Sequence, residues 1–526
     1  MVTNKKRGRY YTPPKLAKWI SQRVLNMVQG FGHVRILEPS CGDGVFFRAI
    51  EECDSQEALQ VDGVEIESEV LNQAQTSYPS ATLFNKDFLL WNSTQAYDII
   101  LGNPPYISKK NLTADQATAC KNIHIEAGLA NREISNIWTS FVVKSSRILS
   151  SHGIMAFVIP TELLQVKYAQ EIRTYLLNNF ERIEIISFKK LAFETLEQDT
   201  VILIASKTAD ENGFFFTEVD SIEELCQAPM RLRRRDGAEN TKWTSFILDE
   251  EELSLVDRLN QLCKPISSYC SSVAGIVTAA NNYFIVSQEI VDKYSLNKHV
   301  KPIIQKGMFV NGAARYTHEN YEQLRTNGKP CFLLDLNGVD KHKFNQGLID
   351  YLAIGTDKSI HTRYKCSLRQ RWHDVPSIWK SEGFFFKRGH EYPKVLDNQA
   401  KVLVTDAAYR IRMNDKFSMD KFVMSFYNSL TLLCSELYGR YYGGGVLEIT
   451  PNEFKTLPLP YTEETRNYRH FLNSFEAKEN IETFLQTNDR HILHSIPGIT
   501  NTEIGMLQQT YKKVKCRRLR TTHNTL

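Results

Sequence analysis

The fold is decided by the stretch VRILEPSCGDG, residues 34–44. Its first part is a short apolar run of the kind that forms a buried strand, and its second part is a glycine-bearing turn. Gly42 and Gly44 let the backbone turn tightly and let a ligand approach it closely. A strand that leads through such a turn into a helix is typical of a doubly wound α/β sheet, whose ligands bind at the carboxyl ends of the strands.

The same pattern continues along the chain to about residue 206. Further short apolar runs lie at 59–66, 81–85, 97–103, 153–160, 183–188 and 200–206, and amphipathic segments separate them. This alternation predicts a Rossmann-like α/β catalytic domain over residues 1–240. We interpret residues 207–245 as an interdomain connection, because the rhythm breaks there. A mixed α+β domain over 241–462 and a helical, basic C-terminal extension over 463–526 are expected to follow.

Composition excludes several classes of protein. The chain is 42% hydrophobic and 24% charged, as in soluble globular proteins. No apolar run approaches the roughly 18 to 20 residues that span a bilayer. The basic N-terminus has no apolar stretch behind it and does not resemble a signal peptide. The ten cysteines form no C-x-x-C pair, which favours reduced thiols in a cytoplasmic protein, without structural metal or disulfides.

Charge is unevenly shared between the two halves. Residues 1–240 carry a net charge of −4 and residues 241–526 carry +8, so the second half suits a polyanionic partner. Candidate DNA-contacting side chains lie in its arginine-rich and aromatic stretches: Arg363, Arg369, Arg371, Lys387 and Arg388. Ordinary core aromatics beside surface charge explain about half of these stretches equally well. For the basic residues at 512–520, a solvated or disordered end is the favoured interpretation.

The strongest chemical signal is Asn103-Pro104-Pro105-Tyr106, directly after the apolar run 97–102. The exocyclic nitrogen of adenine is a poor nucleophile because its lone pair is delocalised into the ring. The Asn103 amide oxygen and the Pro104 carbonyl can each accept one N6–H and aim the lone pair at a methyl donor. Two prolines stiffen the loop, and Tyr106 offers an aromatic face to an extruded base. No strong general base is needed, because the proton can leave after methyl transfer.

Acidic residues end the first three predicted strands. Glu38 can accept from a cationic ammonium group, Glu65 from ribose hydroxyls, and Asp87 from an adenine amino group. Ile66 and Phe88 would form apolar walls. Together these positions outline a pocket for an adenosyl cofactor. Thr12 precedes a proline-started helix, where it is suited to cap the helix and to help hold a carboxylate.

The order of these motifs resembles the gamma class of N6-adenine DNA methyltransferases, the TaqI-like type II modification enzymes, over residues 8–206. The resemblance implies that Asn103, Pro104 and Tyr106 handle the target adenine and that Phe193 stacks on its other face. It also implies a target-recognition domain, with Ala279 at a position where glycine is common. The residues that we expect to contact S-adenosylmethionine are Thr12, Glu38, Ser40, Cys41, Gly42, Glu65, Ile66, Asp87, Phe88 and Pro105.

Several alternatives stay open. The same tetrapeptide occurs in enzymes that methylate a protein glutamine or an exocyclic amine of ribosomal RNA. A fused restriction–modification enzyme would need a nuclease segment, which is usually N-terminal, and the first motif begins at residue 8. A non-catalytic DNA-binding subunit would have no need for Asn103, Pro104 and Tyr106. We therefore expect a monomeric methyltransferase of double-stranded DNA that is paired in the cell with a separately encoded restriction endonuclease.

Overall fold

The computed structural model describes residues 11–53, 55–130, 134–190, 199–227, 230–239, 242–310, 312–442, 444–464 and 467–520. The chain divides into two compact units. Unit 1 comprises Met1–Leu248 with Tyr442–Gly444, and unit 2 comprises Asp249–Tyr441 with Gly445–Leu526. Residues 467–520, expected in a separate extension, cluster with unit 2.

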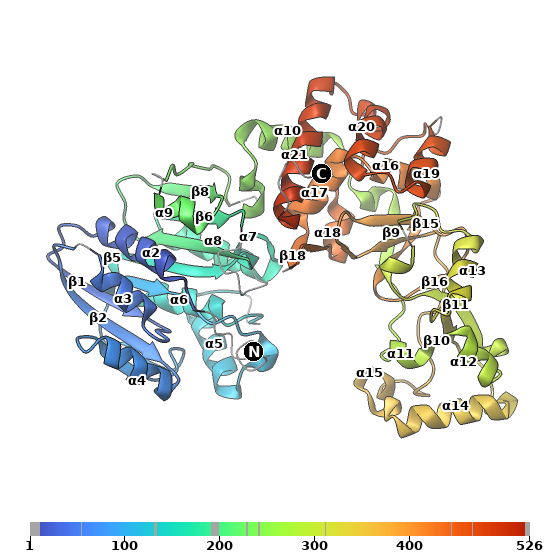
Figure 1. Ribbon diagram of the computed structural model, residues 1–526, viewed down its shortest axis with the longest axis horizontal. Coiled ribbons are helices and arrows are strands. Elements are labelled where there is room, and N and C mark those ends of the chain that lie inside the picture. Colours follow the sequence, from blue (N-terminus) through green and yellow to red (C-terminus); the bar gives the residue numbers. More distant parts are fainter. Residues whose placement is uncertain are drawn as a thin grey trace. The chain divides into compact units, whose positions relative to one another are not determined.

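Unit 1 is built on an eight-stranded sheet of order β3-β2-β1-β4-β5-β7-β6-β8 (Figure 1). The strands are β1 (His33–Glu38), β2 (Ala58–Glu65), β3 (Thr82–Asn85), β4 (Tyr97–Gly102), β5 (Leu149–Pro160), β6 (Arg182–Phe188), β7 (Thr200–Ser206) and β8 (Gly213–Val219). Strands β1 to β5 pair in parallel, whereas β7 is antiparallel to both β5 and β6. The strand order reverses between β1 and β4, and such a switch point is where doubly wound sheets bind ligands. The predicted α/β fold class is confirmed.

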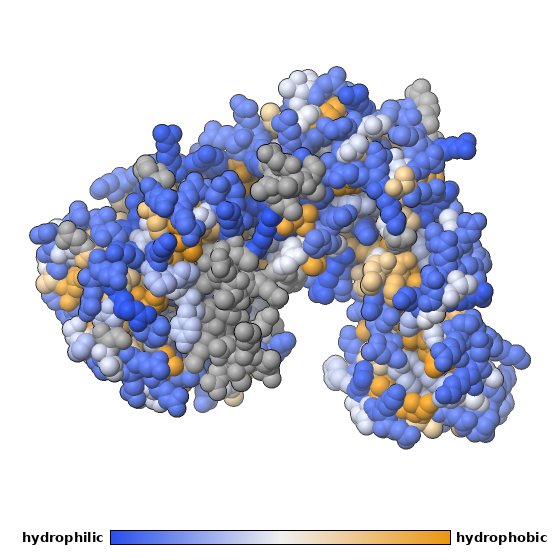
Figure 2. Space-filling view, in the orientation of Figure 1, coloured by the Kyte–Doolittle hydropathy of each residue, from blue (hydrophilic) through white to orange (hydrophobic). Residues whose placement is uncertain are grey.

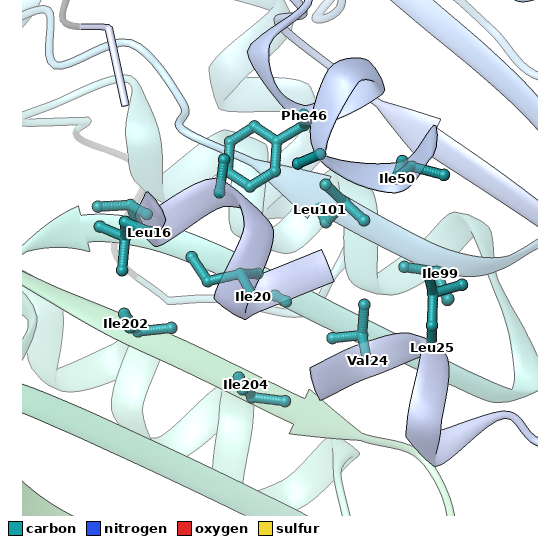
Figure 3. Close-up of a cluster of buried hydrophobic side chains, with 14 of the residues drawn as sticks. Leu16, Ile20, Val24, Leu25, Phe46, Ile50, Ile99, Leu101, Ile202 and Ile204 are labelled. Carbon is teal, nitrogen blue, oxygen red and sulfur yellow. The ribbon is translucent and has the colours of Figure 1, made fainter. Parts of the chain in front are cut away.

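The helices of unit 1 are α2 (Pro14–Met27), α3 (Val45–Glu51), α4 (Ser68–Ser77), α5 (Ala114–Glu126), α6 (Trp138–Ile148), α7 (Glu162–Gln165), α8 (Gln170–Asn179) and α9 (Ile222–Gln227). Helices α2, α4, α6 and α9 contact the sheet, and the other helices of the unit pack against helices. Figure 3 shows Ile20 and Val24 of α2 among strand residues that include Leu101, Ile202 and Ile204. All five side chains are buried or nearly so. Each such aliphatic side chain contributes about 1.5–3 kcal/mol, which fixes α2 on the sheet.

The interpretation of residues 207–245 as an interdomain connection is wrong. Strand β8 and helix α9 lie within this segment, and β8 pairs with β6. The run Phe214–Phe216 is buried, with the Phe214 ring 4.4 Å from that of Trp243 and the Arg182 guanidinium 4.0 Å from the Phe215 ring. The charged residues on both sides of β8 led to the wrong interpretation, although its aromatic run is typical of a strand.

Unit 2 has a mixed α+β architecture, as predicted. One four-stranded sheet has the order β10-β12-β11-β16, a second has β15-β13-β17-β9, and a three-stranded sheet has β14-β19-β18. The strands are β9 (Cys270–Ala274), β10 (Ile285–Val286), β11 (Val300–Ile304), β12 (Phe332–Leu334), β13 (Gly383–Phe386), β14 (Arg388–Gly389), β15 (Lys394–Asp397), β16 (Leu403–Val404), β17 (Ala408–Met413), β18 (Arg440–Tyr442) and β19 (Val446–Glu448).

Unit 2 also contains the helices α10 (Glu250–Leu262), α11 (Asn281–Phe284), α12 (Gln288–Lys293), α13 (His318–Thr326), α14 (Gln346–Asp357), α15 (Tyr364–Ser367), α16 (Met419–Phe426), α17 (Ser429–Tyr438), α18 (Pro451–Thr456), α19 (Tyr468–Glu476), α20 (Ile481–Ile492) and α21 (Asn501–Leu519). Of these, α11, α16 and α18 contact strands. None of the described helices is long and apolar enough to cross a membrane.

The expectation of a solvated or disordered basic end is wrong for the described residues up to 520. Helix α21 contacts α17 and α20. Arg518 is buried and donates to both carboxylate oxygens of Glu436, at 2.6 and 2.8 Å. Lys515 Nζ lies 2.6 Å from Glu482 Oε1. These cations are therefore internal ion-pair partners, and the sequence could not show that their carboxylate partners lie across a helix interface.

Candidate active site

A cavity of about 150 Å³ lies in unit 1 at the carboxyl ends of β1, β2 and β4. The structure brings to its wall every residue that the sequence assigned to the cofactor: Thr12, Glu38, Ser40, Cys41, Gly42, Glu65, Ile66, Asp87, Phe88 and Pro105. Asn103 also lines it. Side chains separated by more than 90 positions in sequence therefore share one pocket, because parallel strands bring their carboxyl ends to the same edge. That these residues bind the cofactor is still a prediction.

The turn after β1 is held against the end of β2. Gly42 N donates to Glu65 Oε2 at 3.0 Å, and Cys41 N donates to the Val64 carbonyl at 3.0 Å. Gly42 has a φ of +53°, in the left-handed region that favours glycine. The Glu65 carboxylate also accepts from Glu67 N at 3.0 Å. These bonds fix the Glu65 carboxylate at the wall of the cavity.

The electrostatics of the pocket favour a cationic ligand. Glu38 is buried, and this burial, together with the nearby carboxylates of Asp43 and Glu65, raises the pKa of the Glu38 carboxyl well above its ordinary value. Among the described residues, Glu38 Oε2 has no hydrogen-bond partner. A buried carboxylate oxygen without a donor is costly, and a ligand that carries positive charge would relieve this cost. These carboxylates therefore fit the ammonium group and the positively charged sulfonium group of S-adenosylmethionine.

Thr12 does not cap the helix that follows it. Pro13 occupies the N-cap position of α2, and no side chain caps this helix end. The Thr12 hydroxyl is buried, and among the described residues it has no hydrogen-bond partner. The capping interpretation is wrong because the chain enters the helix one residue later than expected. The hydroxyl lines the cavity instead, where a ligand carboxylate would give it an acceptor.

Asp87 and Phe88 are fixed from two sides. Asp87 Oδ1 accepts from Leu89 N at 2.9 Å, and Asp87 Oδ2 accepts from Gln116 Nε2 at 2.9 Å. Lys144 Nζ donates to the Leu89 carbonyl at 2.9 Å and lies 5.2 Å from the centre of the Phe88 ring. Burial lowers the pKa of Lys144 to about 8. The turn that presents Asp87 and Phe88 is thus supported by helices α5 and α6.

The loop after β4 carries the predicted catalytic residues. Asn103 is half-buried, and its main-chain carbonyl accepts from Ser40 Oγ at 3.2 Å. Tyr106 is buried, with 8% of its surface exposed, and its hydroxyl lies 2.8 Å from Asn103 Oδ1 and 2.9 Å from the Val158 carbonyl. Pro104 is buried and does not line the cavity. Phe193 lies outside the described residues.

Among the residues of the pocket that sequence reasoning missed are Phe141 and Gln116. Phe141 of α6 lines it, with its ring 4.9 Å from that of Phe88. Gln116 of α5 lines it and binds Asp87. Thr113 and Gln116 form a helix-capping pair, which the sequence spacing T-x-x-Q could have indicated. Nothing local in the sequence indicates the contact with Asp87. No group of metal-ligating side chains was found among the described residues.

The predicted DNA-contacting residues of unit 2 differ in their surroundings. Arg371 forms a double contact with Asp374, at 2.7 and 2.9 Å, and Arg369 donates to the Thr278 carbonyl at 2.8 Å. Arg363 is exposed, although its Nη1 donates to the Ala279 carbonyl at 3.2 Å. Lys387 is half-buried, and Arg388 is exposed beside Glu448. Arg369 and Arg371 are thus hydrogen-bonded to neighbouring segments of unit 2.

A larger cavity of about 990 Å³ lies in unit 2, near α11, α14 and α15. Its rim includes Lys358, Arg363 and Lys365, and the adjacent Tyr364 is 77% exposed. In Figure 2, hydrophobic residues gather over this part of unit 2 among hydrophilic ones. Ala279, in the loop at the cavity, has a φ of +68°, which explains why glycine suits this position.

The switch-point pocket, its acidic strand ends and the sheet with antiparallel β7 together define an S-adenosylmethionine-dependent methyltransferase fold. Family models match most of the chain. Residues 19–193 match the Eco57I restriction-modification methylase, and residues 240–493 match the C-terminal domain of type II methyltransferase M.Eco57I. The chain is a type II restriction–modification methyltransferase of this Eco57I-like family.

Individual relatives agree with this placement. The chain is 22% identical to type II methyltransferase M.AccI from Acinetobacter calcoaceticus over 85% of its length and 84% of that protein. It is 31% identical to type II methyltransferase M.TthHB8I from Thermus thermophilus over 32% of this chain and 38% of that one. The structure of the type IIL restriction-modification enzyme MmeI in complex with DNA is similar in fold, with a TM-score of 0.57 and 12% identity over 97% of this chain and 73% of that one.

Proposed function

We propose that this protein transfers a methyl group from S-adenosylmethionine to N6 of an adenine that is turned out of double-stranded DNA. The observation that carries the proposal is the position of Asn103 and Pro105 on the wall of an acidic pocket, which also contains every residue predicted to bind the cofactor. An amide oxygen beside a methyl donor is suited to a substrate whose amino group receives the methyl, because amide and carbonyl oxygens accept hydrogen bonds from N–H groups.

The cofactor would be held by the strand ends. Glu38 would accept from its ammonium group, Glu65 from the ribose hydroxyls and Asp87 from the adenine amino group, with Thr12 at the carboxylate. Ile66, Phe88 and Pro105 would flank the adenine ring. When bound, S-adenosylmethionine supplies an electrophilic methyl group. The three acceptors lie on a sheet edge that already fixes their backbone, so little order has to be gained on binding.

The target amine would be activated by hydrogen bonds alone. Asn103 Oδ1 and the Pro104 carbonyl would accept the two N6 protons, which directs the nitrogen lone pair toward the methyl group. N6 would gain the methyl group as the bond between that methyl and the cofactor sulfur breaks, which leaves a neutral thioether, and N6 would then release one proton to water. Tyr106 would contact one face of the base and Phe193 the other, which supports an extruded rather than a stacked adenine.

Unit 2 would grip the DNA. Arg363, Lys387 and Arg388 are proposed as phosphate contacts, since surface cations bind the backbone without regard to sequence. Arg369 and Arg371 are proposed to act indirectly, by holding the loops beside them. We further propose that the protein works as a monomer with a separate endonuclease. The match to most of M.AccI, which is named as a methyltransferase alone, supports this separation.

The experiment is label transfer from tritiated S-adenosylmethionine to unmodified duplex DNA, RNA and protein, followed by chromatography of the labelled nucleoside. The expected product is N6-methyladenine in DNA, and label in cytosine, RNA or protein would refute the proposal. Asn103→Ala should lower turnover by on the order of 100- to 1000-fold with little change in cofactor affinity. Asn72→Ala, at an exposed position of α4, is the matched control and should leave turnover unchanged.

A further inference from the structure

The Tyr106 hydroxyl occupies an unusual position at the end of the sheet. The pairing of β4 with β5 ends at Gly102 and Phe157. Val158 is the next residue of β5, and its carbonyl is 2.9 Å from the Tyr106 hydroxyl. The loop that leaves β4 therefore returns to β5 through a side chain. Beyond the last residue pair of β4 and β5, the Tyr106 hydroxyl thus donates to the main-chain carbonyl of the next β5 residue.

The same hydroxyl contacts the side chain on which the proposed chemistry depends. It lies 2.8 Å from Asn103 Oδ1. A phenol has one proton, and both neighbouring atoms are carbonyl-type oxygens, so this single proton serves two acceptors. An amide oxygen has two lone pairs. A hydrogen bond from Tyr106 therefore fixes the amide plane of Asn103.

We propose that the Tyr106 hydroxyl is a positioning group, which sets the orientation of the Asn103 amide relative to β5. This role is separate from any stacking of the Tyr106 ring on a base. It rests on the proposed function, because it assumes that Asn103 Oδ1 is the acceptor for the target amine. The ring is 8% exposed, and with its hydroxyl anchored on Val158 it has little freedom to reorient.

The test is Tyr106→Phe, which keeps the ring and removes only the hydroxyl. Tyr97→Phe is the matched control. Tyr97 is the first residue of β4, it is buried, and its hydroxyl donates to Asp62 Oδ2 at a distance of 2.8 Å. Neither Tyr97 nor Asp62 lines the pocket. The rate of methyl transfer to unmodified genomic DNA is measured under single-turnover conditions, with enzyme in excess, so that slow variants can also be measured. We expect Tyr106→Phe to lower the rate about 10-fold, as for one lost hydrogen bond, with unchanged KM for the cofactor. Tyr97→Phe should keep the normal rate.

A double-mutant cycle separates positioning from other roles. In the Asn103→Ala background, adding Tyr106→Phe should cause no further loss, because the group to be oriented is already gone. A further 10-fold loss in that background, or a normal rate for Tyr106→Phe alone, would overturn the positioning role. If Asn103→Ala itself kept normal turnover, the proposed function would fail instead. The two failures are therefore distinguishable.

Discussion

Gln116→Leu gives the most informative test of the cofactor pocket. The Gln116 side chain makes two contacts: Nε2 donates to Asp87 Oδ2 at 2.9 Å, and Oε1 accepts from Thr113 N at 3.2 Å. Leucine keeps much of the volume and loses both contacts. Asp87 would retain the hydrogen bond from Leu89 N. A hydrogen bond to a charged group contributes about 1.5–3 kcal/mol, so the lower end predicts a rise of about 10-fold in the cofactor Kd.

Loss of the capping contact must be separated from loss of the Asp87 contact. Thr113→Ala serves this purpose, because it removes the acceptor for Gln116 N at the start of α5 and leaves the Gln116–Asp87 bond in place. Both variants should lower the unfolding free energy by about 1 kcal/mol. Only Gln116→Leu should weaken cofactor binding, measured by calorimetric titration with S-adenosylhomocysteine. Equal Kd values for the two variants would refute the assignment of Gln116 to the adenosyl pocket.

Two further predictions concern stability. Ala279→Gly should raise the unfolding free energy by about 0.5–1 kcal/mol. Relief of the left-handed alanine stabilises the folded state by about 1–2 kcal/mol, and part of this gain is offset because glycine has more conformational entropy in the unfolded chain. A lower unfolding free energy in denaturant titration would contradict this prediction. Asp489 is buried, and burial raises its pKa to about 6. Since the folded protein then binds this proton more tightly than the unfolded chain, stability should fall by up to about 3 kcal/mol as the pH rises from about 4 to 6. Asp489→Asn should remove this slope in urea titrations, and an unchanged slope would contradict the assignment.

Residues at strand ends could be predicted from the sequence because their position follows from periodicity alone. Glu38, Glu65 and Asp87 each end an apolar run, and parallel strands place such ends at one edge. Gln116 could not be found this way. Its contact with Asp87 depends on how α5 packs against the turn after β3, which no local pattern encodes.

Charged residues of unit 2 illustrate a second limit. The sequence shows that Arg371 lies in a basic and aromatic stretch, which suggests a nucleic-acid surface. It does not show that the guanidinium is already paired with Asp374, or that Arg518 reaches Glu436 across a helix interface. For Arg518 the partner lies 82 positions away, so the local sequence cannot distinguish it from a solvent-facing arginine. For Arg371 the partner is only three residues away, but the sequence does not show that the two side chains pair.

The register of two strands joins the cofactor half of the site to its target half. β1 and β4 are neighbours, with Leu37 opposite Ile100, so the turn that follows β1 and the loop that follows β4 leave the sheet side by side. Ser40 Oγ then donates to the Asn103 carbonyl at 3.2 Å, which links a residue at the cofactor to the residue proposed to hold the target. A methyl donor and an amine must approach to about 3–3.5 Å to react. In the proposed reaction, strand pairing would set this separation before either ligand binds, so a one-residue shift between β1 and β4, which would displace one turn relative to the other by about 3.3 Å, is expected to prevent transfer.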